Sequence, residues 1–94
     1  MAEVKKIHRN ITIGGKVQGV GFRYAAKTMA LSLGINGIAR NLLNGDVYIE
    51  AEGSEVQLKH LIDWCHKGPS FAYVENVNIE NGELKGFNRF EIVH

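Results

Sequence analysis

A glycine-rich segment that ends in an arginine has the residue types and spacing best suited to chemistry. It reads Gln18-Gly19-Val20-Gly21-Phe22-Arg23 and lies between a predicted strand and a predicted helix. Glycines let the backbone approach a ligand closely, and the first turn of a helix presents N–H groups that have no intrahelical acceptor. Together with the positive end of the helix dipole, this is a general design for binding phosphate. The Arg23 guanidinium can also donate to two oxygens of one phosphate or carboxylate.

Asn41 is the second candidate, because it follows Arg40 at the end of another predicted strand. A side-chain amide both donates and accepts hydrogen bonds, so it is able to orient a water molecule beside a bound phosphate. Both candidates also have a purely structural interpretation. The first is then a glycine-rich turn with a surface arginine, and the second is a strand-end asparagine that caps a backbone group.

The glycine-rich segment does not complete other well-known ligand motifs. Tyr24 stands where a dinucleotide fingerprint has its third glycine, and the Gly-Lys-Ser/Thr of a Walker loop is absent from the sequence. The four residues from Gly19 to Phe22 are similar to the core of an RNA-recognition signature. They precede a helix here, whereas that signature places its aromatic residues on a central strand. We therefore expect no nucleic-acid partner.

The histidines and the single cysteine do not predict a metal site. His60 shares a helix face with neither Cys65 nor His66, because these pairs are separated by about 140° and about 120° around the helix axis. His8 is expected on the outer face of the first strand, and Cys65 on the buried stripe of the second helix as an inert core residue. One cysteine also excludes an intramolecular disulfide and a cysteine-only zinc site. We expect no metal and no cofactor.

The apolar pattern predicts the elements that must position the two candidates. Alternating isoleucines predict a strand over residues 7–13, and apolar residues at steps of three and four predict a helix from Phe22 to Leu33 that Gly34 ends. Strands are predicted over 36–43 and 46–52, joined by an Asn44-Gly45 hairpin turn. The remaining predictions are a second helix between a Ser54 capping box and Gly68-Pro69, a fourth strand through Val74, Val77 and Ile79, a turn at Asn81-Gly82, and a fifth strand through Phe87, Phe90 and Ile92.

The element order is β-α-β-β-α-β plus a short final strand. It predicts the α+β class and a ferredoxin-like two-layer α/β sandwich, with an antiparallel sheet and two helices on one face. The length of 94 residues predicts one domain over residues 1–94.

The charge is unevenly distributed along the chain. Residues 1–40 hold seven Lys/Arg against one acid, a net +6, whereas residues 41–94 carry a net −5 and the whole chain +1. The small total argues against a dedicated nucleic-acid or anionic-membrane binder, while the basic half is a weak indication of anion handling. The sequence has no apolar run of membrane-spanning length, and its start lacks a signal-peptide pattern. We expect a cytoplasmic protein without membrane association.

Four stretches of the sequence resemble the acylphosphatase family, and together they span nearly the whole chain. The stretch Gly15–Arg23 resembles the family's signature loop, and Gly37–Val47 is similar to its second signature. Gly68–Val74 and the ending Phe90–Ile92 are also similar. Two positions depart from the family pattern, because Ile38 stands where a tryptophan is common and Asn44 where an aspartate commonly precedes the glycine. From the resemblance, we expect Ile38 to alter the packing beside the site.

The resemblance implies hydrolysis of acyl phosphates to a carboxylate and inorganic phosphate, without a metal. It implies that Arg23 binds the phosphate, that the backbone amides of residues 18–23 form a cradle, and that Asn41 positions the water. A free-standing enzyme, monomeric and acting on a small molecule, is the leading expectation. A non-catalytic module that binds an anion or a partner protein is the alternative, since similar domains occur inside larger carbamoyl-phosphate-handling proteins.

Overall fold

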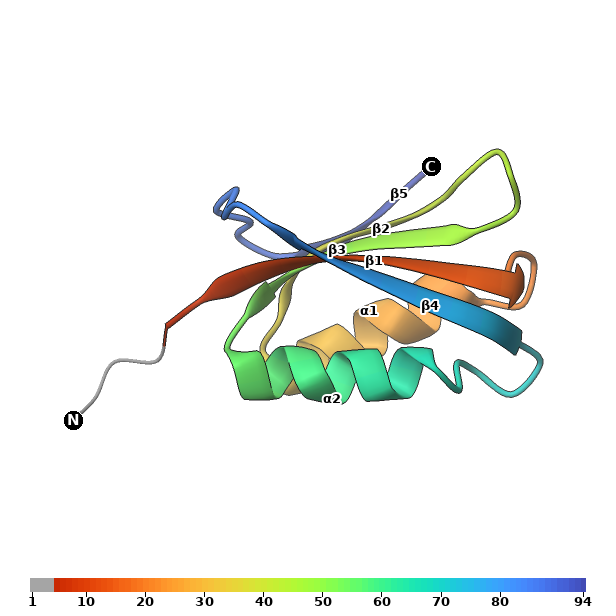
Figure 1. The fold of residues 1–94 in the computed structure, drawn as a ribbon, viewed down its shortest axis with the longest axis horizontal. Helices are drawn as coiled ribbons and strands as arrows, with labels where there is room; N and C mark the ends of the chain where they lie inside the picture. Colours follow the sequence, from red (N-terminus) through yellow and green to blue (C-terminus); the bar gives the residue numbers. More distant parts are fainter. Residues whose placement is uncertain (1–4) are drawn as a thin grey trace.

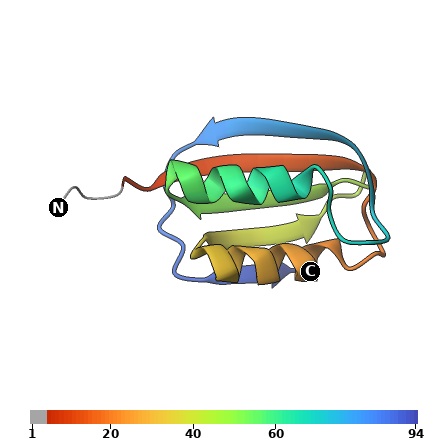
Figure 2. The same ribbon diagram turned by 90° about the horizontal axis from the view of Figure 1, so that it is seen from below.

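The computed structural model describes residues 5–94, which form one five-stranded sheet with two helices on one of its faces (Figure 1). In the view from below, both helices lie in front of the sheet, on the same face (Figure 2). The sequence start, which is expected to lack a signal peptide, includes residues 1–4, and these lie outside the described residues. The elements are β1 (Ile7–Lys16), α1 (Phe22–Leu33), β2 (Asn36–Asn41), β3 (Val47–Gly53), α2 (Glu55–Cys65), β4 (Tyr73–Gly82) and β5 (Phe90–Val93). The predicted ferredoxin-like α+β fold is confirmed.

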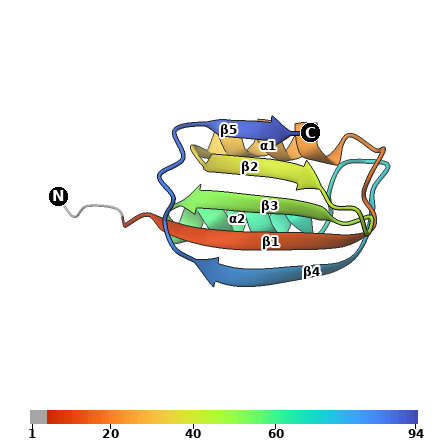
Figure 3. The ribbon, with the colours of Figure 1, turned by 90° about the horizontal axis from the view of Figure 1, so that it is seen from above.

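The sheet is mixed, so the prediction of a purely antiparallel sheet is wrong at one edge. The strand order is β4-β1-β3-β2-β5, and β5 pairs with β2 in parallel. After β4 the chain crosses the sheet along one end, from one edge to the other (Figure 3). The chain then meets β2 at the N-terminal end of that strand. Because β5 starts from this end, it runs in the same direction as β2. The predicted hairpin turn at Asn81-Gly82 is instead the end of β4, where these residues still pair with Arg9 and His8.

The core fills the space between the sheet and the helices. Inward-facing Ile11, Ile13 and Ile49 pack against the small residues Ala26 and Ala30 of α1 and the apolar stripe of α2. That stripe consists of Leu58, Leu61 and Cys65, all of which are buried. Burial raises the pKa of the Cys65 thiol to about 12, which fits the expected inert core residue.

Local sequence fixes where the helices begin and end. Gly34 closes α1 in a left-handed conformation with φ of 75°, and its N–H donates to the carbonyls of Ala30 and Leu31. Ser54 and Gln57 form the predicted capping box at the start of α2. No helix over the described residues has the length and apolar character needed to cross a membrane.

The outer face of the sheet holds an ionic cluster beneath the crossing segment. His8 lies on this face, as expected, but it is only 1% exposed because Phe87 stacks against its ring. His8 Nδ1 donates to Glu52 Oε2 at 2.7 Å, and Lys85 Nζ pairs with Glu50 Oε1 at 2.6 Å. The polar side of β3 is therefore partly buried rather than open to solvent.

Candidate active site

The loop between β1 and α1 has the conformation that its glycines allow. Gly19 and Gly21 have φ of 74° and 76°, which side chains other than glycine adopt at a cost. A Cβ added at either glycine meets no atom within 4 Å. These positions therefore need glycine for the backbone turn and not for lack of space, and the surface they leave is open to a ligand.

The N-terminus of α1 faces this loop without a side-chain cap. Gly21 is the N-cap residue, and the first turn contains no acidic side chain. The first intrahelical bond runs from the Ala25 N–H to the Gly21 carbonyl at 3.0 Å, so the N–H groups of residues 22–24 have no intrahelical acceptor. The end of the helix therefore offers donors and a positive dipole to an anion.

Arg23 and Asn41, which come from different elements, line the same small cavity. Its volume is about 140 Å³, room for roughly five water molecules at about 30 Å³ each, and thus for one tetrahedral anion. The other lining residues belong to the loop and the first turn of α1: Val17, Gly19, Gly21, Phe22 and Tyr24. Two residues of the predicted cradle, Gln18 and Val20, are not among the lining residues.

Arg23 is oriented by the last strand of the sheet. Its Nη1 donates to the Val93 carbonyl of β5 at 3.1 Å. A guanidinium carries five N–H donors, so this contact fixes its direction and still leaves donors for two oxygens of an anion. Sequence reasoning missed this partner, because a backbone carbonyl leaves no signal in the identity of its residue.

Asn41 ends β2, where it is exposed and pairs with Val47 of β3. Within residues 5–94 its side chain makes no hydrogen bond to a backbone group, which is the contact that a capping asparagine would make. Its amide is thus available to a water molecule in the cavity.

The two other basic residues near the site lie beside it. Lys16 ends β1 and is exposed. The guanidinium of Arg40 lies over the ring of Tyr48 at 5.1 Å from its centroid, on the outer face of the sheet. Neither of them lines the cavity, so any contribution to anion binding is long-range attraction.

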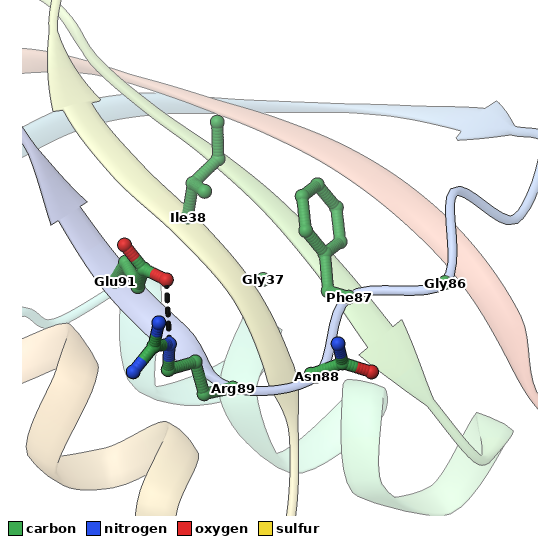
Figure 4. A pocket seen from close by; sticks show the side chains of 7 residues that line it. All are labelled: Gly37, Ile38, Gly86, Phe87, Asn88, Arg89 and Glu91. Atoms are coloured by element: carbon green, nitrogen blue, oxygen red, sulfur yellow. Dashed lines mark hydrogen bonds and ion pairs between the residues drawn. The ribbon is translucent and has the colours of Figure 1, made fainter.

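A larger cavity on the outer face lacks these features. It has a volume of about 560 Å³ and lies between β2 and the segment leading into β5 (Figure 4). Arg89 lines it, but its Nε pairs with Glu91 Oε1 at 2.7 Å. Ile38 also lines this cavity, whereas the pocket that holds Arg23 and Asn41 is lined by other residues. Ile38 is thus not a lining residue of the candidate site, and its expected effect on the packing beside that site stays a prediction.

The fold and the pocket define a class of protein: a ferredoxin-like α+β domain with a glycine-rich loop at a helix N-terminus, beside a small cavity that an arginine and an asparagine line. The acylphosphatase family model matches residues 9–92. An acylphosphatase of Acaryochloris marina is 46% identical over 81 residues, covering 86% of this chain and 87% of that protein. The chain therefore belongs to the acylphosphatase family, and the prediction that it is an enzyme of this kind is confirmed.

Two solved structures are similar over 99% of the chain. The acylphosphatase of Coxiella burnetii has a TM-score of 0.93 at 33% identity, with 100% of that chain covered. Full-length HypF, solved in a phosphate- and nucleotide-bound form, has a TM-score of 0.90 at 29% identity, but only 12% of that chain is covered. The same fold thus occurs in a small acylphosphatase and as a small part of a longer protein.

Proposed function

We propose that this protein hydrolyses the carboxyl–phosphate bond of small acyl phosphates, giving a carboxylate and inorganic phosphate, without a metal ion. Arg23 and the backbone amides of residues 18–23 bind the phosphate, and Asn41 positions the attacking water. The observation that carries this proposal is the meeting of Arg23 and Asn41 at one 140 Å³ cavity beside the uncapped N-terminus of α1. Family membership supplies the substrate class.

The cavity is lined by Arg23, Asn41, apolar residues, glycines and Tyr24, without a histidine or a carboxylate. Most hydrolases need a general base or acid at such a site. An acyl phosphate is a mixed anhydride, however, and its leaving group is a carboxylate. The conjugate acid of that carboxylate has a pKa near 4, about the value of Asp or Glu, so it departs without protonation. The lining therefore fits an activated substrate better than a phosphate monoester, whose alkoxide leaving group needs a proton.

Phosphoryl transfer asks mainly for positioning and charge stabilisation, because its transition state is loose. Arg23 and the loop amides would offset the charge on the phosphoryl oxygens. Asn41 would hold the water in line with the bond that breaks. We assign the proton of the water to the substrate phosphate itself, since no side chain of the cavity lining is a suitable acceptor.

The test is hydrolysis of benzoyl phosphate by the wild type and by Arg23→Ala, each with and without EDTA. We expect turnover that EDTA does not change and that Arg23→Ala loses. Turnover that EDTA abolishes would contradict the metal-free mechanism. An inactive wild type would favour the alternative, a non-catalytic module that binds an anion or a partner protein.

Inorganic phosphate provides an independent check of the cradle. It is the product and carries the same headgroup as the substrate, so it should inhibit competitively. The proposal also includes a monomeric, cytoplasmic protein without a nucleic-acid partner. The net charge of +1 supports only the last of these expectations. Size-exclusion chromatography with light scattering tests the monomer.

A further inference from the structure

The side chain of Gln18 is not part of the cavity lining and joins two segments of the site. Its Nε2 donates to the Leu42 carbonyl at 2.7 Å and to the Asp46 carbonyl at 2.9 Å. A primary amide has two N–H hydrogens, and both are used here. Gln18 thus connects the loop before α1 to the hairpin turn between β2 and β3.

The two acceptors are the two ends of that hairpin turn. The Leu42 N–H donates to the Asp46 carbonyl at 2.8 Å, and the Gly45 N–H donates to the Leu42 carbonyl at 3.1 Å. Asn41 directly precedes Leu42, and its pairing partner Val47 directly follows Asp46. Gln18 therefore holds the backbone of both hairpin arms at the residues next to the Asn41–Val47 pair.

Asn41 needs such a restraint, because its own surroundings give little. It is exposed, and within residues 5–94 its side chain has no hydrogen bond to the backbone. The turn that follows it is at the surface, with Leu43 and Asn44 exposed. Arg23, in contrast, is oriented by the Val93 carbonyl of β5. The β2–β5 pairing holds Arg40 beside Val93, but Asn41 is the last residue of β2, so its position relative to Arg23 also depends on how firmly the hairpin is attached to the loop.

We propose that Gln18 is a positioning residue for the hydrolysis: its amide attaches the hairpin to the loop and so fixes Asn41 relative to Arg23. This inference rests on the proposed function, because it assigns a role within that reaction. It differs from the cradle role of the Gln18 backbone, since it concerns the side chain alone. Displacement of a reacting group by about 1 Å can cost about 100-fold in rate, so a loosened hairpin has a measurable effect.

The principal test is Gln18→Met, which keeps the length and removes both donors without adding charge. With benzoyl phosphate we expect kcat to fall about tenfold, while KM and inhibition by phosphate change by less than about twofold. The same substitution is then made in Asn41→Ala. If Gln18 acts through Asn41, it should lower kcat by less than about twofold in that background, because the positioned group is already missing.

Gln57→Met is the matched control. Gln57 caps α2, and its side chain lies near Gly34 at the opposite end of α1 from the loop. Its replacement removes the acceptor for the Ser54 N–H and lowers the melting temperature, but leaves kcat within about twofold. Gln18→Asn is a second variant in case Gln18→Met does not fold: it keeps the amide but is one methylene too short to reach both carbonyls, so kcat should fall here as well.

Hydrogen exchange of the Leu42 N–H reports the attachment independently of activity. We expect faster exchange in the Gln18 variants than in the wild type and in Gln57→Met. Unchanged exchange, an unchanged kcat, a loss confined to KM, or a tenfold loss that persists in Asn41→Ala would each overturn the inference. If the wild type fails to hydrolyse benzoyl phosphate, the proposed function fails, and exchange at Leu42 still shows whether Gln18 attaches the hairpin.

Discussion

At the scale of single residues, the Arg23 side chain has two roles: one contact orients it, and its remaining donors are left for an anion. It contacts β5 through Val93, and it is the guanidinium that lines the small cavity. We expect Arg23→Ala to lower kcat/KM by about 10³-fold or more, as does the loss of a transition-state arginine in other phosphoryl transfers. Arg23→Lys should recover little, because an ammonium group does not bind two oxygens in the same way. Steady-state kinetics with benzoyl phosphate measure both.

Arg40→Ala is the control for this experiment, since it removes the same charge from a residue that lies over Tyr48 and outside the cavity. It should change kcat/KM by less than about threefold at moderate ionic strength. Equal losses in the two alanine variants would mean that general attraction of anions, and not a bidentate contact, explains the effect of Arg23.

Asn41 should separate catalysis from binding. If its amide holds only the water, Asn41→Ala lowers kcat by about 100-fold and leaves the inhibition constant of phosphate within about twofold. Asn78→Ala, on the exposed part of β4, is the matched control and should behave as the wild type. Full turnover by Asn41→Ala would show that its assigned role is wrong.

At the scale of elements, the loop depends on backbone conformation more than on packing. Gly19 and Gly86 have φ of 74° and 78°, and an added Cβ meets nothing within 4 Å at either position. Gly19→Ala and Gly86→Ala should therefore lower the free energy of unfolding by the same amount, about 1–2 kcal/mol. Only Gly19 lines the cavity, so only Gly19→Ala should also raise the inhibition constant of phosphate, by about tenfold. Denaturant unfolding and inhibition assays separate the two effects, and an inhibition constant that stays unchanged in Gly19→Ala would contradict the cradle.

The element pattern also shows why sequence reasoning succeeded for most of the fold and failed at its end. Alternating isoleucines in β1, apolar steps of three and four in α1, and the capping box of α2 are local signals, and each matches the structure. The direction of β5 is not a local property. It depends on the segment of residues 83–89 crossing the end of the sheet, which the Asn81-Gly82 turn signal did not indicate. For the same reason the sequence predicted Arg23 and Asn41 as candidates but did not predict Val93 or the side-chain contacts of Gln18.

At the scale of the whole molecule, the outer face of the sheet is connected to the cavity through the C-terminal part of the chain. Glu52 Oε1 accepts from the N–H groups of Gly86 and Phe87 at 3.1 Å, and its Oε2 accepts from Lys85 N–H. These contacts hold the crossing segment against β3. The segment leads into β5, whose Val93 carbonyl orients Arg23. The buried carboxylate therefore holds the segment that leads into the strand contacted by Arg23.

This connection predicts how stability depends on pH. Burial by itself would raise the pKa of Glu52, but hydrogen bonds from the Lys85 N–H, from His8 and from the Phe87 and Gly86 N–H groups lower it on balance. A carboxyl whose pKa is lower in the folded state stabilises the fold above its unfolded pKa, near 4.3 to 4.5, and loses this contribution as the pH falls through the folded pKa. Below about pH 4.5, the free energy of unfolding of the wild type should therefore decrease, and part of that decrease should be absent from Glu52→Gln.

Glu52→Gln should in addition be destabilised by about 3 kcal/mol near pH 7, because the amide NH2 faces backbone donors in place of an acceptor oxygen and the partner His8 stays buried. Glu91→Gln is the matched control: its carboxylate pairs with Arg89 at the surface, so it should cost less than about 1 kcal/mol and keep the acid dependence of the wild type. Denaturant unfolding between about pH 3 and pH 7 measures both variants.

Because the crossing segment leads to Val93, Glu52→Gln should also lower kcat/KM for benzoyl phosphate, although Glu52 does not line the cavity. A variant as stable as Glu91→Gln, or one that is destabilised with wild-type kinetics while folded, would show that the outer face does not support the orientation of Arg23.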